Sequence, residues 1–577
     1  MSKTVADQLV EALVFAGAER VYGVVGDSLN PVVDAIRRAE GIEWVHVANE
    51  EAGAFAAAAD AQVTGKLAVC AGSCGPGNTH LLQGLFDAQR SGAPVLAIAS
   101  HITSTEVGTG FFQETHPERI FTECSEWCEV ITSAAHMPRS ARIAIQTALG
   151  APGVSVMVLP GDVAGQKAEG AVGPTDFAAS PSPVLPDPEQ VDALAEAIEA
   201  ADKITLFCGA GCKGAHEQVM TLAKTLGAPV AHALRGKEYI QANNPYDVGM
   251  CGLLGYGAAH KATFEADLLI LLGTDFPYTN FLPQKNTAQV DRDPTRLGRR
   301  TPLEVAVVGD VGKTIEALLP KISSKTSRAF LDDMLKLHAR TLEKVVEAYT
   351  HDVESMKPIH PEWVASHLDR IAADDAIFTV DTGMCNVWAA RYLTPNGKRR
   401  VIGSFRHGSM ANALPHAIGA QAAFPDRQVV AMCGDGGLSM LLGDLITLKR
   451  YELPAKLVVF NNGSLGMVKL EMMVDGLVDF GTDNGSVNYA AVAQALGISA
   501  IRVEDPAEVP RALEDGLSRK GPVLIDVVTD KNALSMPPAI TAEQVAGFAK
   551  SASKSILGGG VGKMVELART NLRNIPV

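Results

Sequence analysis

The chain has 577 residues, with 47% hydrophobic and 20% charged side chains and a formal net charge of −15. That length calls for three or four domains with separate cores. The acidic balance argues against nucleic acid as the main partner, and no apolar run is long enough to span a bilayer. Residues 1–20 are typical of an amphipathic helix and lack the apolar stretch and cleavage site of a secretory signal, so we expect a cytoplasmic protein.

In residues 1–180, strand-like apolar runs alternate with helical segments, which predicts a doubly wound α/β domain. Glu50 follows an apolar strand and precedes an alanine-rich helix. Its carboxyl group is either desolvated, which disfavours the charged form, or an ordinary helix-start acid stabilised by the helix dipole. Further on, Phe111, Phe112 and Gln113 form an apolar and amide patch in a glycine-flanked loop, a kind of segment that often carries function.

A stretch rich in Pro, Ser and Ala, 171–190, predicts a linker to a second α/β domain at 181–342. The first strand of that domain is followed by residues 209–214 (GAGCKG), whose glycine spacing matches a dinucleotide-binding fingerprint. Because this spacing is common and no well-placed acidic residue follows, the fingerprint alone does not decide whether a nucleotide binds there. A third α/β domain is predicted at 343–533.

The third domain contains the most informative segment. An apolar strand ends in GDGG (434–437), a helical segment covers 439–451, and a second strand ends in NN (461–462). Ligands of parallel sheets gather at the carboxyl ends of strands, so Asp435 and Asn462 should share a rim. A carboxylate and an amide oxygen suit Mg²⁺ completed by phosphate oxygens, and glycines before a helix N-terminus can receive phosphate. The alternative is an ordinary strand-helix-strand unit with a polar turn.

Residues 534–577 have little strand character and form two apolar helical faces separated by glycines 558–560. From residue 550 onward there are five basic residues and one acidic residue, which gives a local net charge of about +4 in an otherwise acidic chain. A basic amphipathic end can lie on an anionic membrane. It can equally be a terminal helix docked on the body with a solvated basic face, and the sequence leaves both possibilities open.

GDGG followed by NN at this distance is similar to the thiamine-diphosphate motif. The stretches that carry a closer resemblance are GVVGDSLN (23–30), LAVCAGSCGPGN (67–78), FFQETHP (111–117), HALRGKE (232–238), NPYDVGM (244–250), LLGTDFPY (271–278), GSFRHGSMANA (403–413) and VVAMCGDGG (429–437). Across nearly the whole chain, the sequence resembles the thiamine-diphosphate- and flavin-dependent pyruvate:quinone oxidoreductases, the bacterial pyruvate oxidases that form acetate.

The resemblance implies three doubly wound parallel-sheet domains: pyrimidine-binding (1–180), FAD-binding (181–342) and diphosphate-binding (343–533). An amphipathic, membrane-binding tail would follow at 534–577. The implied reaction is oxidative decarboxylation of pyruvate to acetate and CO₂, with electrons passing to FAD and then to a membrane quinone, ubiquinone or menaquinone. The implied assembly is a homotetramer with each thiamine site between two subunits, bound peripherally to the inner face of the cell membrane. The alternatives are an acetolactate-type carboligase with non-redox FAD and a catalytically silent, membrane-associated binding protein.

The resemblance also assigns individual residues. Glu50 resembles the glutamate that contacts N1′ of the thiamine pyrimidine, and Phe112 and Gln113 resemble residues of the pyruvate pocket. Mg²⁺ would be held by Asp435, Asn462 and the carbonyl of Ser464. The other thiamine-diphosphate contacts would be Gly408, Ser409, Met410, Gly436, Gly437, Gly463, Leu465, Gly466, Met467 and Val468. The FAD contacts would be Arg235, Cys251, Gly252, Leu253, Leu254, Thr274, Asp275, Phe276, Pro277, Tyr278 and Asp291.

Within that set, the carbonyl of Gly408 would contact the pyrimidine. Met410 would wedge beneath the cofactor, although it could equally be a core residue. Three features depart from the family pattern: Asn49 replaces the usual His, Met467 replaces a Phe, and the tail lacks a tryptophan. These departures bear on electron transfer and on the response to lipid.

Overall fold

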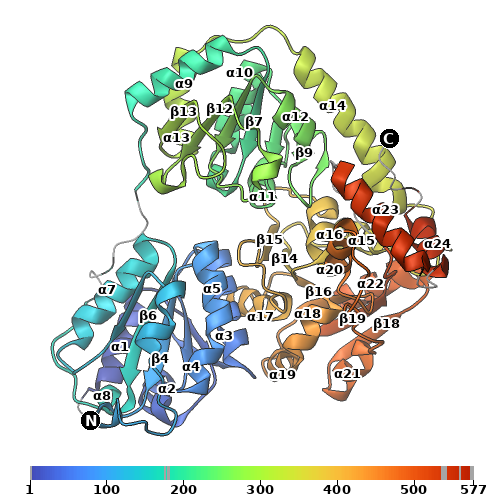
Figure 1. The fold of residues 1–577 in the computed structure, drawn as a ribbon. Coiled ribbons are helices and arrows are strands. Elements are labelled where there is room, and N and C mark those ends of the chain that lie inside the picture. The colour runs from blue at the N-terminus through green and yellow to red at the C-terminus, as the bar shows by residue number, and fades with distance from the viewer. Residues whose placement is uncertain are drawn as a thin grey trace.

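The structure is a computed structural model that describes residues 3–173, 177, 182–533, 542–557, 561–571 and 573. It contains three α/β domains, each built on one sheet of six or seven strands, which confirms the predicted fold class. Figure 1 shows the first domain at lower left, the middle domain at the top and the third domain at lower right. Among the described helices, none combines the length and the apolar character needed to cross a membrane.

The first sheet is parallel throughout, with the strand order β2-β1-β3-β4-β6-β5. Its strands are β1 (Arg20–Gly23), β2 (Glu43–His46), β3 (Ala68–Gly72), β4 (Val95–His101), β5 (Trp127–Val130) and β6 (Val154–Pro160). Its helices are α1 (Val5–Phe15), α2 (Asn30–Arg38), α3 (Glu50–Thr64), α4 (Pro76–His80), α5 (Leu82–Ser91), α6 (Pro117–Ile120), α7 (Met137–Gly150) and α8 (Gly161–Ala164). Every residue of the four inner strands is buried, because helices cover both faces of the sheet.

The third sheet repeats the same topology, with the order β15-β14-β16-β17-β19-β18. Its strands are β14 (Ile377–Val380), β15 (Arg400–Gly403), β16 (Val429–Gly434), β17 (Lys456–Asn461), β18 (Ser499–Val503) and β19 (Val523–Val528). Its helices are α15 (Pro361–Ile371), α16 (Met384–Tyr392), α17 (Ala413–Ala423), α18 (Asp435–Met440), α19 (Leu445–Arg450), α20 (Gly466–Val474), α21 (Tyr489–Ala495) and α22 (Val509–Ser518). The strand order reverses between β14 and β16, which opens a crevice for ligands at their carboxyl ends.

The middle sheet has the order β10-β9-β8-β7-β11-β12-β13. Its strands are β7 (Ile204–Cys208), β8 (Val230–His232), β9 (Asp247–Met250), β10 (Tyr256–Gly257), β11 (Leu268–Leu272), β12 (Thr287–Asp291) and β13 (Val305–Val308). Its helices are α9 (Pro188–Ala200), α10 (His216–Leu226), α11 (Leu234–Ile240), α12 (Ala259–Glu265), α13 (Val311–Leu318) and α14 (Ala329–Thr341). The sheet is parallel except at one edge, where β10 runs antiparallel to β9. The five residues between them (251–255) are too few for the crossover that a parallel pair needs.

A seam of small residues joins the first and third domains. Helices α3 and α17 pack together, and a Cβ on Gly419 would overlap the carbonyl oxygen of Ala56. Alanines of α3 and apolar residues of α17 belong to a single buried core. The two domains are therefore one packed body at this seam.

The predicted single helix at 439–451 is divided. α18 ends at Met440, a 3₁₀ turn follows at Leu442–Asp444, and α19 begins at Leu445. The break places the Asp444 carboxylate where it accepts the N–H of Ala48 from the first domain at 2.8 Å. A contact between domains thus overrides the local helical periodicity.

The tail forms α23 (Ala542–Leu557) and α24 (Val561–Thr570), and the predicted glycine break at 558–560 lies outside the described residues. α23 lies along α20, where Ser551 Oγ donates to Leu477 O at 2.6 Å and Lys554 Nζ to Gly476 O at 2.8 Å. Leu567 of α24 packs with Leu470 of α20. In this structure the described part of the tail is docked on the third domain (Figure 1).

Candidate functional site

The predicted diphosphate anchor lies at the crevice of the third sheet. β16 ends at Gly434, and Asp435 begins α18 at the rim. Burial raises the pKa of Asp435, and the nearby N–H groups of Gly436 and Gly463 oppose that rise. Only 3% of Asp435 is exposed. Removing a carboxylate from water in this way favours a cation bound beside it.

Asn462 and Ser464 lie on the loop between β17 and α20. Ser464 N–H donates to Asn462 Oδ1 at 2.9 Å, and the carbonyl of Ser464 accepts Gly466 N–H at 2.9 Å. Because Gly463 of this loop donates to Asp435, the three predicted Mg²⁺ ligands belong to two touching loops. Among the residues that the structure describes, no group of three or more His, Cys, Asp or Glu side chains could hold a metal. A cation here would take one carboxylate, amide and carbonyl oxygens and the phosphates of a ligand, a set that suits Mg²⁺.

The small-residue loop 404–412 touches this anchor. A Cβ on Gly436 would come 2.7 Å from Leu465 Cδ2 and 3.3 Å from Met410 Cε, so the turn has room only for glycine. Met410 therefore lies beside the anchor turn, and Gly408 and Ser409 precede it on the same loop. On the other side, Met467 is half-buried and Val468 is exposed at the start of α20.

Asp381 is a buried carboxyl group of this site that the sequence analysis missed. It follows β14, across the crevice from Asp435, and is 1% exposed. Its Oδ1 accepts Asn412 N–H at 3.1 Å, and a Cβ on Gly437 would collide with its Oδ2. Asp381 therefore ties the loop of Met410 to the anchor turn. The available signal was a lone acid directly after an apolar strand, the same pattern that identified Asp435.

Asp381 should also shape the pH dependence of stability. Burial raises its pKa from 3.8 to about 7. Between these values the folded chain retains a proton that the unfolded chain releases, so the stability that this group contributes falls as the pH rises from about 4 to about 7. We expect Asp381→Asn to remove that fall, a relative gain of at most about 1.4 kcal/mol per pH unit. Urea midpoints of both proteins across this range measure it, and a difference that stays constant with pH would contradict the assignment.

Glu50 is fixed at the start of α3. Asn49, the departure from the family pattern, caps this helix by accepting Glu51 N–H at 2.9 Å. Glu50 Oε2 lies 2.9 Å from His80 Nδ1, and a Cβ on Gly77 would come 2.9 Å from Oε1. Glu50 is thus a helix-start acid whose buried carboxyl group also engages a separate side chain.

His80 is a second functional candidate that the sequence analysis missed; its only signal was its place after a glycine-rich turn. Its side chain is 50% exposed although it contacts the buried Glu50. Gln113 borders the same turn, because it accepts a hydrogen bond from Cys74 Sγ at 3.4 Å. The structure therefore brings Glu50 and Gln113 to one edge of the first domain. Phe112 is 77% exposed, so the core of its own domain does not cover it.

A cleft of about 1470 Å³ lies among the three domains. The predicted FAD residues on its wall are Arg235, Cys251, Leu253, Leu254, Thr274, Asp275, Phe276, Pro277, Tyr278 and Asp291. Gly252 packs against the ring of Phe276, and a Cβ on Gly252 would come 2.8 Å from Phe276 Cζ. Gly408 and Met467 line the same cleft from the third domain. Its wall therefore joins the predicted flavin segments to the predicted thiamine loop.

The middle sheet explains this placement. Its strand order reverses between β7 and β11, so the loops after these strands flank the crevice where ligands bind. A Cβ on Gly211 would come 2.6 Å from Gly273 Cα, so the glycines of the 209–214 segment allow these loops to touch. On the opposite wall, Thr382 Oγ1 and Asn386 Oδ1 are buried without a hydrogen-bond partner in the described part of the chain. Such polar atoms suit a polar ligand.

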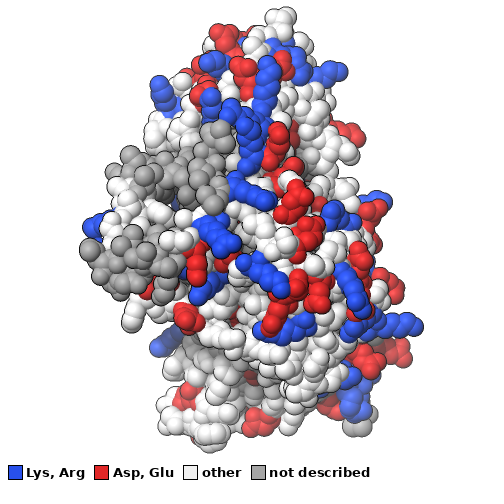
Figure 2. All heavy atoms as spheres, turned by 90° about the vertical axis from the view of Figure 1, so that its right-hand side faces the viewer, with Lys and Arg blue, Asp and Glu red and all other residues white. Residues whose placement is uncertain are grey.

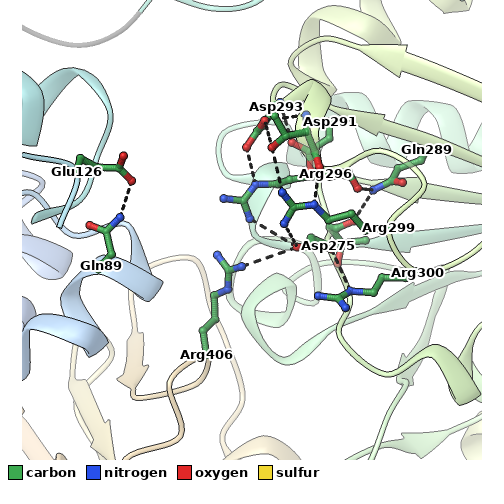
Figure 3. A network of polar contacts seen from close by, with 12 residues as sticks. Gln89, Glu126, Asp275, Gln289, Asp291, Asp293, Arg296, Arg299, Arg300 and Arg406 are labelled. Atoms are coloured by element: carbon green, nitrogen blue, oxygen red, sulfur yellow. Dashed lines mark hydrogen bonds and ion pairs between the residues drawn. The ribbon is translucent and has the colours of Figure 1, made fainter. Parts of the chain in front are cut away.

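Four arginines surround Asp275 at this cleft (Figure 3). The distances to its carboxylate are 3.9 Å from Arg296 NH1, 3.8 Å from Arg299 NH1, 3.3 Å from Arg300 Nε and 3.9 Å from Arg406 NH2. Most of these are ion-pair distances longer than a hydrogen bond. Asp293 takes a further bond from Arg296 Nε at 2.9 Å. These four guanidinium groups lie near three carboxylates, those of Asp275, Asp291 and Asp293, which leaves a small positive surplus that suits a diphosphate.

Comparison with known proteins places this geometry in context. Three protein-family models match the chain, each described as a domain of a thiamine pyrophosphate enzyme. They are the N-terminal TPP binding domain at residues 3–120, the central domain at 191–318 and the C-terminal TPP binding domain at 381–527.

Several curated proteins are similar over almost their full length. A putative thiamine pyrophosphate-containing protein, YdaP, of Bacillus subtilis (strain 168) is 36% identical over 95% of both chains. A pyruvate oxidase of Lactiplantibacillus plantarum is 32% identical over 90% of this chain and 87% of its own. An acetolactate synthase large subunit of Parasynechococcus marenigrum is 32% identical over 94% of this chain and 91% of its own.

Proposed function

The chain belongs to the thiamine pyrophosphate enzyme family, and we propose that it oxidises pyruvate with thiamine diphosphate, Mg²⁺ and FAD and passes the electrons to a membrane quinone. Pyruvate, water and quinone would give acetate, carbon dioxide and quinol. Similarity to a pyruvate oxidase supports pyruvate as the substrate. The quinone is a proposal from the sequence resemblance and the basic tail.

The observation that carries this proposal is the shared cleft. One continuous wall of the cleft is lined by predicted flavin residues of the middle domain and by Gly408 and Met467 of the third domain. A flavin in this cleft would share it with the thiamine loop, as direct electron transfer between the two cofactors requires. The arginine surplus around Asp275 supplies the charge for the FAD diphosphate.

Thiamine diphosphate would supply the electron sink for decarboxylation, and FAD would accept the resulting electron pair. The protein would hold and orient them. Asp435, Asn462 and the Ser464 carbonyl would bind Mg²⁺ with the diphosphate, and Glu50 would hold a proton at pyrimidine N1′. Gln113 and Phe112 would contact pyruvate. From the sequence resemblance, we place Glu50 and the anchor in different subunits of a homotetramer.

Anaerobic flavin reduction tests this function. The purified holoprotein, mixed with pyruvate without oxygen, should lose the flavin absorbance near 450 nm and regain it when a quinone analogue is added. The readout follows electrons directly, so it separates an oxidase from an enzyme that only decarboxylates. A flavin that stays oxidised in the presence of pyruvate would overturn the proposal.

An acetolactate-type carboligase with non-redox FAD is the second candidate, because an acetolactate synthase is 32% identical to this chain. It would release acetolactate from two pyruvate molecules and leave the flavin oxidised. Measuring acetate and acetolactate in the same reaction distinguishes the two enzymes. A catalytically silent, membrane-associated binding protein, the third candidate, would make neither product.

We place the protein in the cytoplasm, attached peripherally to the inner face of the cell membrane through its tail. Lys550 and Arg569 are exposed on the described tail helices, which supports contact with anionic lipid. Figure 2 shows the side of the molecule that carries α14, α23 and α24, and basic and acidic side chains are interspersed there. No large patch of one sign is seen on the described part of this face, so the tail itself would have to supply the lipid contact.

Charge reversal in the tail tests this attachment. The double variant Lys550→Glu, Arg569→Glu should weaken binding to anionic vesicles by about tenfold or more, because each basic residue near such a surface contributes about 1 kcal/mol. Affinity for thiamine diphosphate should not change. Vesicle co-sedimentation measures the effect, with Lys336→Glu on α14 as the control for an exposed lysine outside the tail. Equal loss in the control, or none in the double variant, would contradict the tail assignment.

A further inference from the structure

The loop 404–412 of the third domain connects two sites that lie in different domains. At one end, Arg406 NH2 is 3.9 Å from Asp275, in the arginine cluster of the middle domain. At the other end, Met410 touches Gly436 of the diphosphate anchor. Figure 3 shows Arg406 reaching from the third domain toward Asp275, while the other arginines of the cluster come from the middle domain. Only three residues of sequence thus lie between Arg406 at the flavin cleft and Met410 at the thiamine anchor.

Arg406 is held in an electrostatically unfavourable place. Burial, together with repulsion from the neighbouring Arg235 and Arg296, lowers its pKa to about 10, although Asp275 opposes this change. The pKa of Arg235 is also lowered, chiefly by burial. Partly buried guanidinium groups that repel one another gain most from an added anion. An anionic ligand in the cluster would therefore draw Arg406 toward the middle domain more strongly than Asp275 alone.

Hydrogen bonds restrain the loop 404–412, so that a displacement of Arg406 would also move Met410. Gly408 N–H donates to Ser404 O at 2.7 Å, and Ser409 N–H donates to Ser404 Oγ at 3.0 Å. Asn412 Nδ2 then donates to Ser409 O at 2.8 Å, while Asn412 N–H donates to Asp381 at 3.1 Å. These bonds leave few independent torsions between Arg406 and Met410. Because Asp381 also contacts Gly437, the far end of the loop is fixed to the anchor turn.

We propose that Arg406 couples the two cofactor sites, so that FAD in the arginine cluster fixes the position of the stiff loop 404–412 and strengthens thiamine-diphosphate binding at the anchor. This inference rests on the proposed function in assuming that both cofactors bind. It adds that their binding is cooperative within one chain and names the residue that transmits it. Thermodynamic linkage then requires thiamine diphosphate to strengthen FAD binding by the same factor.

Reciprocal titration of the cofactor-free, full-length protein tests the coupling. FAD is titrated by flavin fluorescence, with and without saturating Mg²⁺ and thiamine diphosphate. Thiamine diphosphate with Mg²⁺ is titrated by calorimetry, with and without saturating FAD. We expect each cofactor to tighten the other by about fivefold or more, with equal factors in both directions. In Arg406→Gln the factor should fall to near one.

Arg299→Gln is the matched control. Arg299 lies 3.8 Å from the same carboxylate but belongs to the middle domain, so its loss should weaken FAD binding while the coupling factor persists. Thiamine-diphosphate affinity without FAD should match the wild type within about twofold in both variants, which shows that the anchor is folded. The coupling alone is overturned if the wild type binds FAD but neither cofactor tightens binding of the other. It is also overturned if Arg406→Gln binds both cofactors with the wild-type coupling factor. A wild-type chain that binds no FAD overturns the coupling and the proposed function together.

Discussion

Replacing Glu50 by glutamine should slow pyruvate-dependent flavin reduction by about 10²- to 10⁴-fold, the range for loss of a positioned proton-transfer group. Glutamine keeps the size and part of the hydrogen bonding of glutamate but cannot hold the exchangeable carboxyl proton. The position allows little compensation, because Glu50 is 8% exposed and lies between the His80 ring and Gly77. Single-turnover flavin reduction without oxygen measures the loss.

Glu51→Gln provides the control for Glu50. Glu51 is the next residue of the same helix and is half-buried, and burial raises its pKa. The same charge change there should alter the rate by less than about threefold, because Glu51 is not one of the residues assigned to the cofactor. Similar losses at both positions would indicate a general effect on the start of α3. Full activity in Glu50→Gln would refute the role of Glu50.

Asp435→Asn should weaken Mg²⁺-dependent thiamine-diphosphate binding by about 100-fold or more, equivalent to roughly 2.7 kcal/mol. Asp435 is the only carboxylate among the three predicted ligands, so its loss removes the charge attraction for the cation. The cofactor-free variant should nevertheless be at least as stable as the wild type. Burial raises the pKa of Asp435, which means that its ionised form costs free energy in the folded chain at neutral pH.

Thermal unfolding with and without saturating cofactor and Mg²⁺ separates these two effects. The wild type should gain several degrees on loading, and the Asp435→Asn variant should gain almost none. Asp444→Asn is the control: this buried carboxylate accepts hydrogen bonds from Ala48 N–H and Thr447 Oγ1. It should keep the shift on loading, because Asp444 is not one of the predicted Mg²⁺ ligands. A normal loading shift in Asp435→Asn would refute the anchor.

The sequence was most informative where local pattern and chemistry coincide. The alternation of apolar, strand-like runs with helical segments predicted three α/β domains. GDGG with NN predicted a rim shared by Asp435 and Asn462, and the structure places Gly463, the residue after Asn462, beside Asp435. It was less informative where a contact came from elsewhere in the chain. The helix at 439–451 breaks because the Asp444 carboxylate binds Ala48, almost four hundred residues earlier. The antiparallel edge strand depends on a short link that gave no hairpin signal.

The parts of the candidate site that were missed share one property. His80, Asp381 and Arg406 have no motif of their own, and each becomes a candidate only through a partner distant in sequence. His80 meets Glu50, Asp381 meets Asn412, and Arg406 meets Asp275. A local surplus of positive charge likewise cannot be predicted from a sequence, because it depends on which arginines lie around one carboxylate in the folded chain. Such clusters require coordinates.

Helices α3 and α17, which pack together at the seam, are synthesised at widely separated times. Thr64 ends α3 about 350 residues before Ala413 begins α17. At about 5–20 residues per second of synthesis, the alanine-rich face of α3 would wait roughly 20–70 s for its partner helix. During that interval it can be held by a chaperone, or it can pair with α17 of another chain already completed on the same message.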